Sequence, residues 1–464
     1  MSQQLSNNKR RTQHPAVNSP ASVMLLPTSS NFSTSVPAMR MLAIATFLLL
    51  SVLTVACSGL SAMQPARDGQ HAEMRIALHE DMRHGRLDRK AVASLARIVA
   101  EREIREAKDG EAVRQVLRAR ARARELENVF ERRAKQNDPA APHAAMALLD
   151  VGRGNPSKWR SHINSTDPGW RAVAVRTLTG KKNGDARRKG MLDHNQQVRR
   201  AAVRAAEDAA DLADREVLLD TAQHDPDNVV RVTALRAFAA IATEPDVQTM
   251  RDMWSMADSP IRQGLVNAWA HPKVLELGGL RHVMWVAETQ TGIPSIIAGG
   301  VLLRLGGETK GVGSAALYKG AQDGSAHDRA FAIAMAPIEA PGWVELLEKL
   351  SEDAEPTVRI AALEKLASHP KTAASAKEKL EKIAVADLPE SFDAKQAMAR
   401  VRDQRAATLL LADANSSKLD VRESAMKAYV ALEEYARAAF FLSDRDARLR
   451  MTAACTLLMA LSRR

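Results

Sequence analysis

Apolar residues recur along most of the chain with the spacing of an amphipathic α-helix. Between Asp225 and Ala242, apolar side chains fall at positions i, i+4, i+8 and i+11, which lie on one face of a helix. They are Val230, Ala234, Phe238 and Ile241. A second helical pattern precedes them at residues 216–223, so this segment predicts two helices joined by a turn that contains Asp225.

The same turn-and-helix phrase returns at intervals of about 31 residues. Each copy places an apolar residue directly before an arginine near the start of the second helix: Trp170 and Arg171, Val198 and Arg199, Val230 and Arg231, Ile261 and Arg262, Val358 and Arg359, Val421 and Arg422, Leu449 and Arg450. The register also predicts weaker units near Ile293, Asp328 and Glu390. A helix pair cannot bury its apolar face alone, so neighbouring pairs must stack. We therefore predict an all-α superhelix of about ten two-helix repeats.

This phrase resembles HEAT-like repeats, specifically the short bacterial type also found in phycobilin lyases, over residues 145–464. The resemblance implies that repeat aspartates and arginines form a structural ladder between adjacent units. The ladder residues are Asp193, Arg199, Asp225, Arg231, Arg262, Asp353, Arg359, Arg422, Asp444 and Arg450. An aspartate in the turn can cap free N–H groups of the second helix, and an arginine can hold a carboxylate with two hydrogen bonds.

An uncharged apolar run, Met41–Ala56, follows an arginine and ends at Cys57. The run has sixteen residues, whereas a transmembrane helix needs roughly 20, so it has the form of a secretory signal. Residues 53–57 (LTVAC) resemble the lipobox of bacterial lipoproteins, with Thr54 in place of the commoner Leu. The resemblance implies that Cys57 is lipidated and, because Ser58 follows it, that the protein is anchored in the outer membrane and faces the periplasm. An ordinary cleaved signal, an uncleaved anchor and a buried helix are the alternatives.

These features divide the chain into five parts. Residues 1–38 are rich in Ser, Asn, Thr and Pro and precede the signal, so we expect them to be disordered or to lie before a true start at Met39 or Met24. The remaining parts are a signal at 39–56, a flexible tether at 57–70, a basic helical segment at 71–144 and the repeats at 145–464.

The chain carries 66 basic and 55 acidic residues, a formal net charge of +11. Because the two signs are interleaved and the protein is predicted to be exported, nucleic acid is not expected as a partner. Basic residues concentrate in the Arg118–Arg133 region, which contains the run RARARAREL. We interpret this region as part of a solvated helical cap on the repeats, and contact with anionic lipid headgroups or with an acidic partner is the alternative.

Motifs for bond-making chemistry are not found in the sequence. The stretch GGETKGVGS at 306–314 has Val312 where a phosphate-binding P-loop needs lysine, so we interpret it as a loose loop between repeats or a bend in the superhelix. His79 and His84 are spaced i, i+5, whereas the zinc-protease helix needs i, i+4. We expect no catalytic residue, no metal site and no cofactor. With Cys57 lipidated, Cys455 is the one free thiol.

The predicted function follows from the predicted shape. Stacked helix pairs expose a long ridged surface that suits protein partners. We predict a non-enzymatic scaffold or adaptor lipoprotein of the bacterial envelope, whose protein partners the sequence does not identify. The repeat resemblance implies an alternative, a lyase-like or accessory factor that acts on a cofactor-bearing protein. The last predicted helix, Leu449–Leu461, is apolar on two sides, so this end either docks on another protein or copy of the chain or packs internally.

Overall fold

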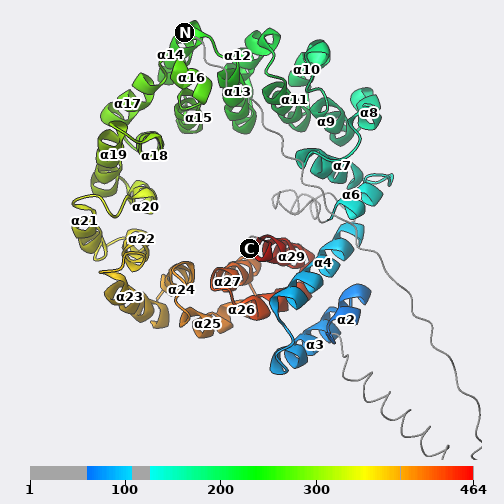
Figure 1. Cartoon of the computed structure of the whole chain (residues 1–464), viewed down its shortest axis with the longest axis vertical. Helices are drawn as coiled ribbons and strands as arrows, with labels where there is room; N and C mark the ends of the chain where they lie inside the picture. Colours follow the sequence, from blue (N-terminus) through cyan, green and yellow to red (C-terminus); the bar gives the residue numbers. More distant parts are fainter. Residues whose placement is uncertain (1–59, 107–125, 387, 463–464) are drawn as a thin grey trace, which may run out of the picture. The chain divides into compact units, whose positions relative to one another are not determined.

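The computed structural model describes residues 60–106, 126–386 and 388–462, which belong to one compact unit. Over these ranges the regular elements are α-helices and short 3-10 helices, with no strand, so the all-α prediction is confirmed. From residue 156 onward the helices form ten successive pairs, in agreement with the repeat spacing (Figure 1).

The helices before the pairs are α2 (Met63–Asp68), α3 (His71–Arg83), α4 (Arg89–Glu106), α6 (Glu127–Arg133) and α7 (Ala141–Asp150). The first members of the pairs are α8 (Pro156–Trp159) with η2 (Arg160–Asn164), α10 (Gly184–Met191), α12 (Arg215–His224), α14 (Glu244–Asp252), α17 (Leu280–Thr289), α19 (Thr309–Asp323), α21 (Trp343–Leu350), α23 (Ala373–Val385), α25 (Ala406–Leu409) with α26 (Leu411–Ala414), and α28 (Tyr435–Ala438) with η6 (Ala439–Ser443). The second members are α9 (Pro168–Arg176), α11 (Gln196–Ala209), α13 (Asn228–Ala240), α15 (Ser259–Trp269), α18 (Ile293–Leu305), α20 (Ala326–Met335), α22 (Pro356–Ala367), α24 (Ser391–Arg400), α27 (Leu419–Ala431) and α29 (Ala447–Leu461). Short connecting helices are η3 (Lys181–Asn183), η4 (Leu212–Asp214), η5 (Met253–Ser255) and α16 (Pro272–Glu276).

The second helices stack in chain order, and the stack closes on itself. Each second helix from α9 to α27 contacts the second helix of the next pair, and the last, α29, packs against α4. From there α4 contacts α6, α6 contacts α7, and α7 contacts α9 again. Figure 1 shows the blue α4 beside the red α29. The apolar flank of α29 that the sequence left open to docking is therefore covered by α4 of the same chain.

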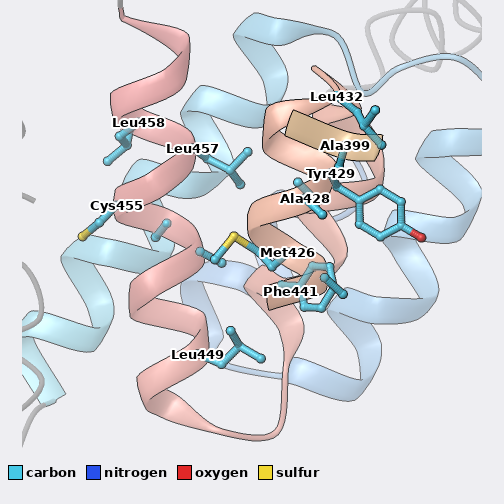
Figure 2. Packing of buried hydrophobic residues seen from close by; sticks show 14 of the residues in the cluster. Ala399, Met426, Ala428, Tyr429, Leu432, Phe441, Leu449, Cys455, Leu457 and Leu458 are labelled. Carbon is cyan, nitrogen blue, oxygen red and sulfur yellow. The ribbon is translucent and has the colours of Figure 1, made fainter. Parts of the chain in front are cut away.

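The two sides of α29 are both buried. Leu457 points toward α27 and Cys455 points away from it (Figure 2), and their side chains are 0% and 3% exposed. Complete burial raises the pKa of the Cys455 thiol to about 12, because desolvation penalises the thiolate. At neutral pH the thiol is therefore protonated as well as inaccessible.

We expect Cys455 to react with an aromatic disulfide reagent only after the protein is unfolded, because the thiolate is the reacting species. The measurement is the rate of thiol labelling at pH 8 with and without denaturant. Cys57→Ser serves as the background, so that Cys455 supplies the whole signal. Rapid labelling of the native protein would contradict the burial described here.

The structure differs from the flexible tether predicted for the residues after Cys57. Residues 63–68 form α2, and its start is held by the buried carboxylate of Asp81. Oδ1 of Asp81 accepts hydrogen bonds from the backbone N–H and the hydroxyl of Ser61, at 3.1 and 2.6 Å, and Oδ2 accepts the N–H of Ala62 at 3.0 Å. A helix capped in this way is an ordered part of the unit.

The glycine-rich stretch predicted as a loose loop is helical as well. Residues 309–323 form α19, which packs closely along α18. A Cβ on Gly313 would lie 2.7 Å from the carbonyl oxygen of Gly299, and a Cβ on Gly299 would lie 2.9 Å from that of Gly313. The glycines therefore allow two helix backbones to approach each other, a role that a glycine count alone does not distinguish from a loop.

Alanine substitutions at two glycines of α19 are expected to have opposite effects. Gly313→Ala should lower stability by about 1–3 kcal/mol, because its methyl group would collide with a facing backbone. Gly311→Ala should raise stability by about 0.5–1 kcal/mol, because nothing lies within 4 Å of its Cβ position and alanine favours the helix. Thermal melting measures both, and equal shifts of the two variants would contradict the close approach.

Candidate functional site

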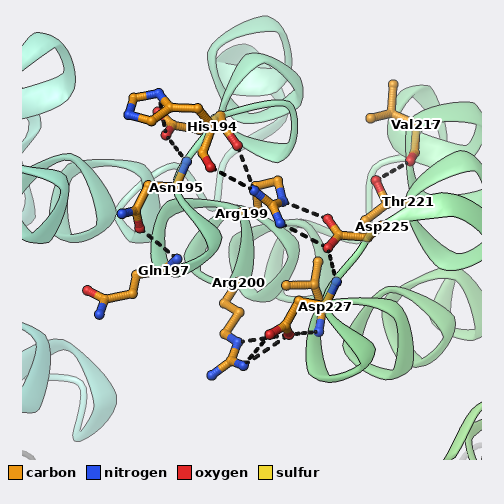
Figure 3. Close-up of polar contacts among 11 residues, drawn as sticks. His194, Asn195, Gln197, Arg199, Arg200, Val217, Thr221, Asp225 and Asp227 are labelled. Carbon is orange, nitrogen blue, oxygen red and sulfur yellow. Dashed lines mark hydrogen bonds and ion pairs between the residues drawn. The ribbon is translucent and has the colours of Figure 1, made fainter.

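Near the start of most second helices, an arginine bridges its own turn and the turn of the next pair. Nη1 of Arg199 donates hydrogen bonds to the carbonyl oxygens of Asp193 and His194, at 3.0 and 3.2 Å (Figure 3). Its Nε and Nη2 donate to the carboxylate of Asp225, at 2.6 and 3.0 Å. One guanidinium thus satisfies backbone acceptors of one repeat and neutralises a carboxylate of the next.

The same rung recurs along most of the array. The pairs are Arg171 with Asp193, Arg329 with Asp353, Arg359 with Glu390, and Arg422 with Asp444. Arg329 and Glu390 were not among the predicted ladder residues, although they lie in the weaker units that the register places near Asp328 and Glu390. The repeat period therefore locates two rung residues that the phrase itself does not.

The turn aspartates do not cap the second helices as the sequence analysis proposed. Asp225 accepts the N–H of Asp227 at 2.8 Å, and it is Asp227 that caps α13 by accepting the N–H of Val230 at 2.9 Å. The same offset of two residues occurs between Asp193 and the cap Asn195, and between Asp444 and the cap Asp446. In these turns the carboxylate that binds the ladder arginine and the side chain that caps the helix are thus separate residues.

Two predicted rungs are irregular. Arg231 lies 3.6 Å from the carboxylate of Asp258, which also caps α15, because Asp258 is the one acidic residue of residues 256–258. Arg262 donates to the carbonyl of Trp254 at 3.4 Å and lies over its ring, 5.6 Å from the centroid. Trp254 in turn contacts Trp269 and Trp285. Aromatic packing therefore takes over where the ladder lacks a carboxylate.

The ladder continues across the closure of the stack. Arg450, on the last helix, donates its Nε and Nη2 to the carboxylate of Glu103 on α4, at 2.6 and 3.1 Å. Both side chains are nearly buried, at 9% and 10% exposed. Glu103 occupies the place of the next repeat's aspartate, although it lies 347 residues away and outside any repeat phrase. The sequence analysis found Arg450 and missed its partner.

The ladder carboxylates make the stability of the protein sensitive to acid. Burial alone would raise the pKa of Asp193, but hydrogen bonds from Arg171 and from the N–H of Asn195 outweigh it and lower the pKa below its ordinary value. Burial would also raise the pKa of Asp227, but hydrogen bonds from Arg200 and from the N–H of Val230 outweigh it. The pKa of Asp227 is therefore lowered too. A carboxyl whose pKa is lower in the folded state stabilises the protein above its unfolded pKa of about 4 and ceases to do so as the pH falls through its folded pKa.

We expect the thermal midpoint to fall steeply below about pH 4, where these carboxylates begin to bind protons. Asp193→Asn should lower the midpoint at pH 7 and flatten its dependence between pH 4 and pH 2. The exposed Asp185→Asn provides the comparison. An unchanged acid profile in the Asp193 variant would contradict this account of the rung.

Part of the basic segment lies outside the described residues, and the predicted lipidation site Cys57 lies outside them as well. Of the Arg118–Arg133 region, the structure describes residues 126–133, and Arg133 there is buried. Its guanidinium pairs with Asp138 at 3.1 Å and donates to the carbonyl of Arg105 at 2.9 Å. Arg133 therefore connects α6 to α4 and is not part of a lipid-facing surface.

The candidate for binding is a groove between α3 and the last two pairs, which we call the α3 groove. It consists of two adjoining cavities of about 400 and 610 Å³. The first cavity is lined by His79, Met82, Leu411, Tyr429, Arg437, Phe440 and Phe441. The second is lined by His71, Ala72, Ser416, Ser417, Arg422, Ser443, Asp444 and Arg445. Three residues line both cavities: Arg75, Ala414 and Asn415. Sequence reasoning missed the groove because its walls are more than 300 residues apart.

Among the described residues, no three His, Cys, Asp or Glu side chains come together as metal ligands. His79 packs its ring on Phe440, with centroids 4.5 Å apart, and does not meet His84. In the same ranges of the chain, no helix has both the length and the apolar character that crossing a bilayer requires.

Comparison with known proteins adds little. No family model matches the chain, and no curated protein matches it. Among solved structures it is similar to Kap121p, at 14% identity and a TM-score of 0.31 over 80% of this chain and 48% of that one. It is also similar to Kap121p bound to Nup53p, at 15% identity and a TM-score of 0.32 over 86% and 52%, and to the karyopherin Kap121p bound to the extreme C-terminus of the phosphatase Cdc14p, at 14% and 0.32 over 80% and 49%. The chain spans about half the length of these structures, and scores this low transfer none of their partners to it.

Proposed function

We propose that the chain is a non-enzymatic scaffold that holds protein partners at the bacterial envelope. The observation that carries the proposal is the α3 groove, where partly exposed apolar side chains from opposite ends of the chain line one cavity. Met82 is 37% exposed and Leu411 is 51% exposed. Contiguous apolar surface of this kind is typical of sites that a partner covers. The polar side chains of the ladder, by contrast, are engaged within the array.

The test is chemical crosslinking of the full chain in its native cell, followed by mass spectrometry. We expect a reproducible set of crosslinked proteins that is lost with Leu411→Asp and kept with Leu305→Asp. Leu305 is a matched control because it is exposed to a similar degree, 45% against 51%, on the distant helix α18. The proposal fails if both variants keep the same set, or if the purified chain carries a chromophore or cofactor, which would favour a lyase-like or accessory role.

We propose further that Cys57 is lipidated and anchors the protein in the outer membrane. The apolar run before Cys57 and its likeness to a lipobox support this. Cys57→Ser should abolish incorporation of a labelled fatty acid and move the protein out of the membrane fraction. Cys455→Ser is the control and should retain both properties, since Cys455 is buried in the array. Continued fatty-acid labelling of the Cys57 variant would overturn the anchor.

A further inference from the structure

The two cavities of the α3 groove adjoin each other but are chemically different. They share Arg75, whose Nη2 donates to Oδ1 of Asn415 at 3.1 Å and so joins the two walls of the groove. One cavity is lined mainly by aromatic and aliphatic side chains, and the other by hydroxyls, histidine and arginine. A ligand that fills both must therefore carry an apolar group next to a polar or charged one.

The apolar cavity is shaped by partly exposed rings and side chains. The ring of His79 lies 4.5 Å from that of Phe440, and Met82 and Leu411 border the same space. The hydroxyl of Tyr429 is already bonded to the carbonyl of Ala407 at 3.2 Å, so this residue offers its ring rather than its oxygen. The cavity of about 400 Å³ has room for a bulky side chain and is smaller than the two acyl chains of a phospholipid.

The groove has an excess of positive charge at Arg75 and Arg445, because Arg422 pairs with Asp444 and Arg437 lies 3.5 Å from Glu434. Four arginines line the two cavities, Arg75, Arg422, Arg437 and Arg445, against one carboxylate, that of Asp444. Arg422 already holds Asp444, with Nε–Oδ2 and Nη2–Oδ1 distances of 2.9 and 3.0 Å. Arg75 and Arg445 bond to neutral oxygens, those of Asn415 and Ser417. Their charge is therefore available to an anionic partner.

We propose that the α3 groove binds an extended acidic protein segment that places one bulky apolar side chain in the apolar cavity and its carboxylates against Arg75 and Arg445. This inference rests on the proposed scaffold function and names the chemistry of the partner. The side chain supplies the buried anchor, and the carboxylates select acidic segments and speed their association. An anionic lipid shares the charge but not the single compact anchor.

The test uses the full chain in detergent and a fluorescein-labelled short peptide in which one Phe is flanked by Glu and Asp. Fluorescence anisotropy should show saturable binding that weakens about tenfold or more when Phe is replaced by Ser, or when Glu and Asp are replaced by Lys. Two groove variants should weaken binding by about tenfold or more. One is Leu411→Asp, and the other is the double variant that combines Arg75→Glu with Arg445→Glu. The matched controls Leu305→Asp and Arg304→Glu, both on α18, should leave it unchanged.

Equal binding of the acidic and lysine peptides would overturn the inference, as would groove variants that bind like the unmodified chain. Displacement of the peptide by anionic phospholipid vesicles but not by unlabelled peptide would assign the groove to lipid and also overturn it. The outcome is separable from that of the scaffold proposal. Native crosslinks that persist in the double arginine variant would leave a scaffold with a different partner chemistry. Peptide binding without native crosslinks would leave a peptide-binding groove that does not serve the proposed scaffold function.

Discussion

Replacement of Arg187 by alanine is expected to destabilise the repeats around α10 by about 3–5 kcal/mol. The guanidinium of Arg187 is fully buried and lies between two carboxylates, 2.6 Å from Asp214 and 3.2 Å from Asp211. It also donates to the carbonyl oxygens of Leu178 and Gly180, at 2.7 and 3.1 Å. Its loss leaves buried acceptors without donors, which is more damaging than the loss of an exposed ion pair.

The appropriate measurement is local, because a long repeat array need not unfold in a single step. Hydrogen exchange followed by mass spectrometry should show loss of protection in α10, α11 and α12 and little change in α22. Arg236→Ala is the control: its pair with Glu207 is exposed and should contribute less than about 1 kcal/mol. Similar exchange in the two variants would show that the Arg187 network is not the main polar support of this region.

Replacement of Arg450 by alanine is expected to open the contact between α4 and α29 at a similar cost of about 3–5 kcal/mol. The substitution leaves Glu103 buried without its partner and frees the carbonyl oxygens of Asp444 and Arg445, which Arg450 holds at 2.8 and 3.2 Å. Protection from hydrogen exchange should fall in α4 and α29 together. Loss of protection in α29 alone would mean that α4 does not depend on this rung.

A double-mutant cycle isolates the pair itself. Glu103→Ala, Arg450→Ala and the double variant should give a coupling of about 1–3 kcal/mol, the range of contacting charged residues. Arg236→Ala and Glu207→Ala provide a matched cycle on an exposed pair, where the coupling should be below about 1 kcal/mol. A coupling near zero between Glu103 and Arg450 would reduce the closing rung to a packing contact.

The repeat period predicted the all-α fold and much of the ladder. Arg199 and Asp225 lie in consecutive copies of one phrase, so stacking of adjacent copies brings them together. Glu103 could not be found in the same way, because its contact with Arg450 depends on how far the array curves over all of its pairs. The capping role of Asp227 was missed for a local reason: two acidic residues, Asp225 and Asp227, share this turn, and the backbone geometry decides which of them faces the helix.

The candidate site was harder to predict than the fold. The α3 groove joins residues 71–82 to residues 411–445, and no pattern within either segment shows that the other lies opposite. Gly299 and Gly313 illustrate a related limit. Glycine is typical both of loops and of tightly packed helices. Here the two are distinguished by the facing carbonyl oxygens, which lie 2.7–2.9 Å from where a Cβ would be.

The contact between α4 and α29 also constrains how this chain can evolve. An open solenoid tolerates tandem duplication or deletion of a unit, because every internal junction resembles the others. Here the insertion or deletion of a unit would shift Arg450 relative to Glu103, so that the two side chains no longer meet. Descendants of this chain should therefore keep the copy number of their helix pairs even where the sequences of those pairs diverge, and length variation should be confined to loops.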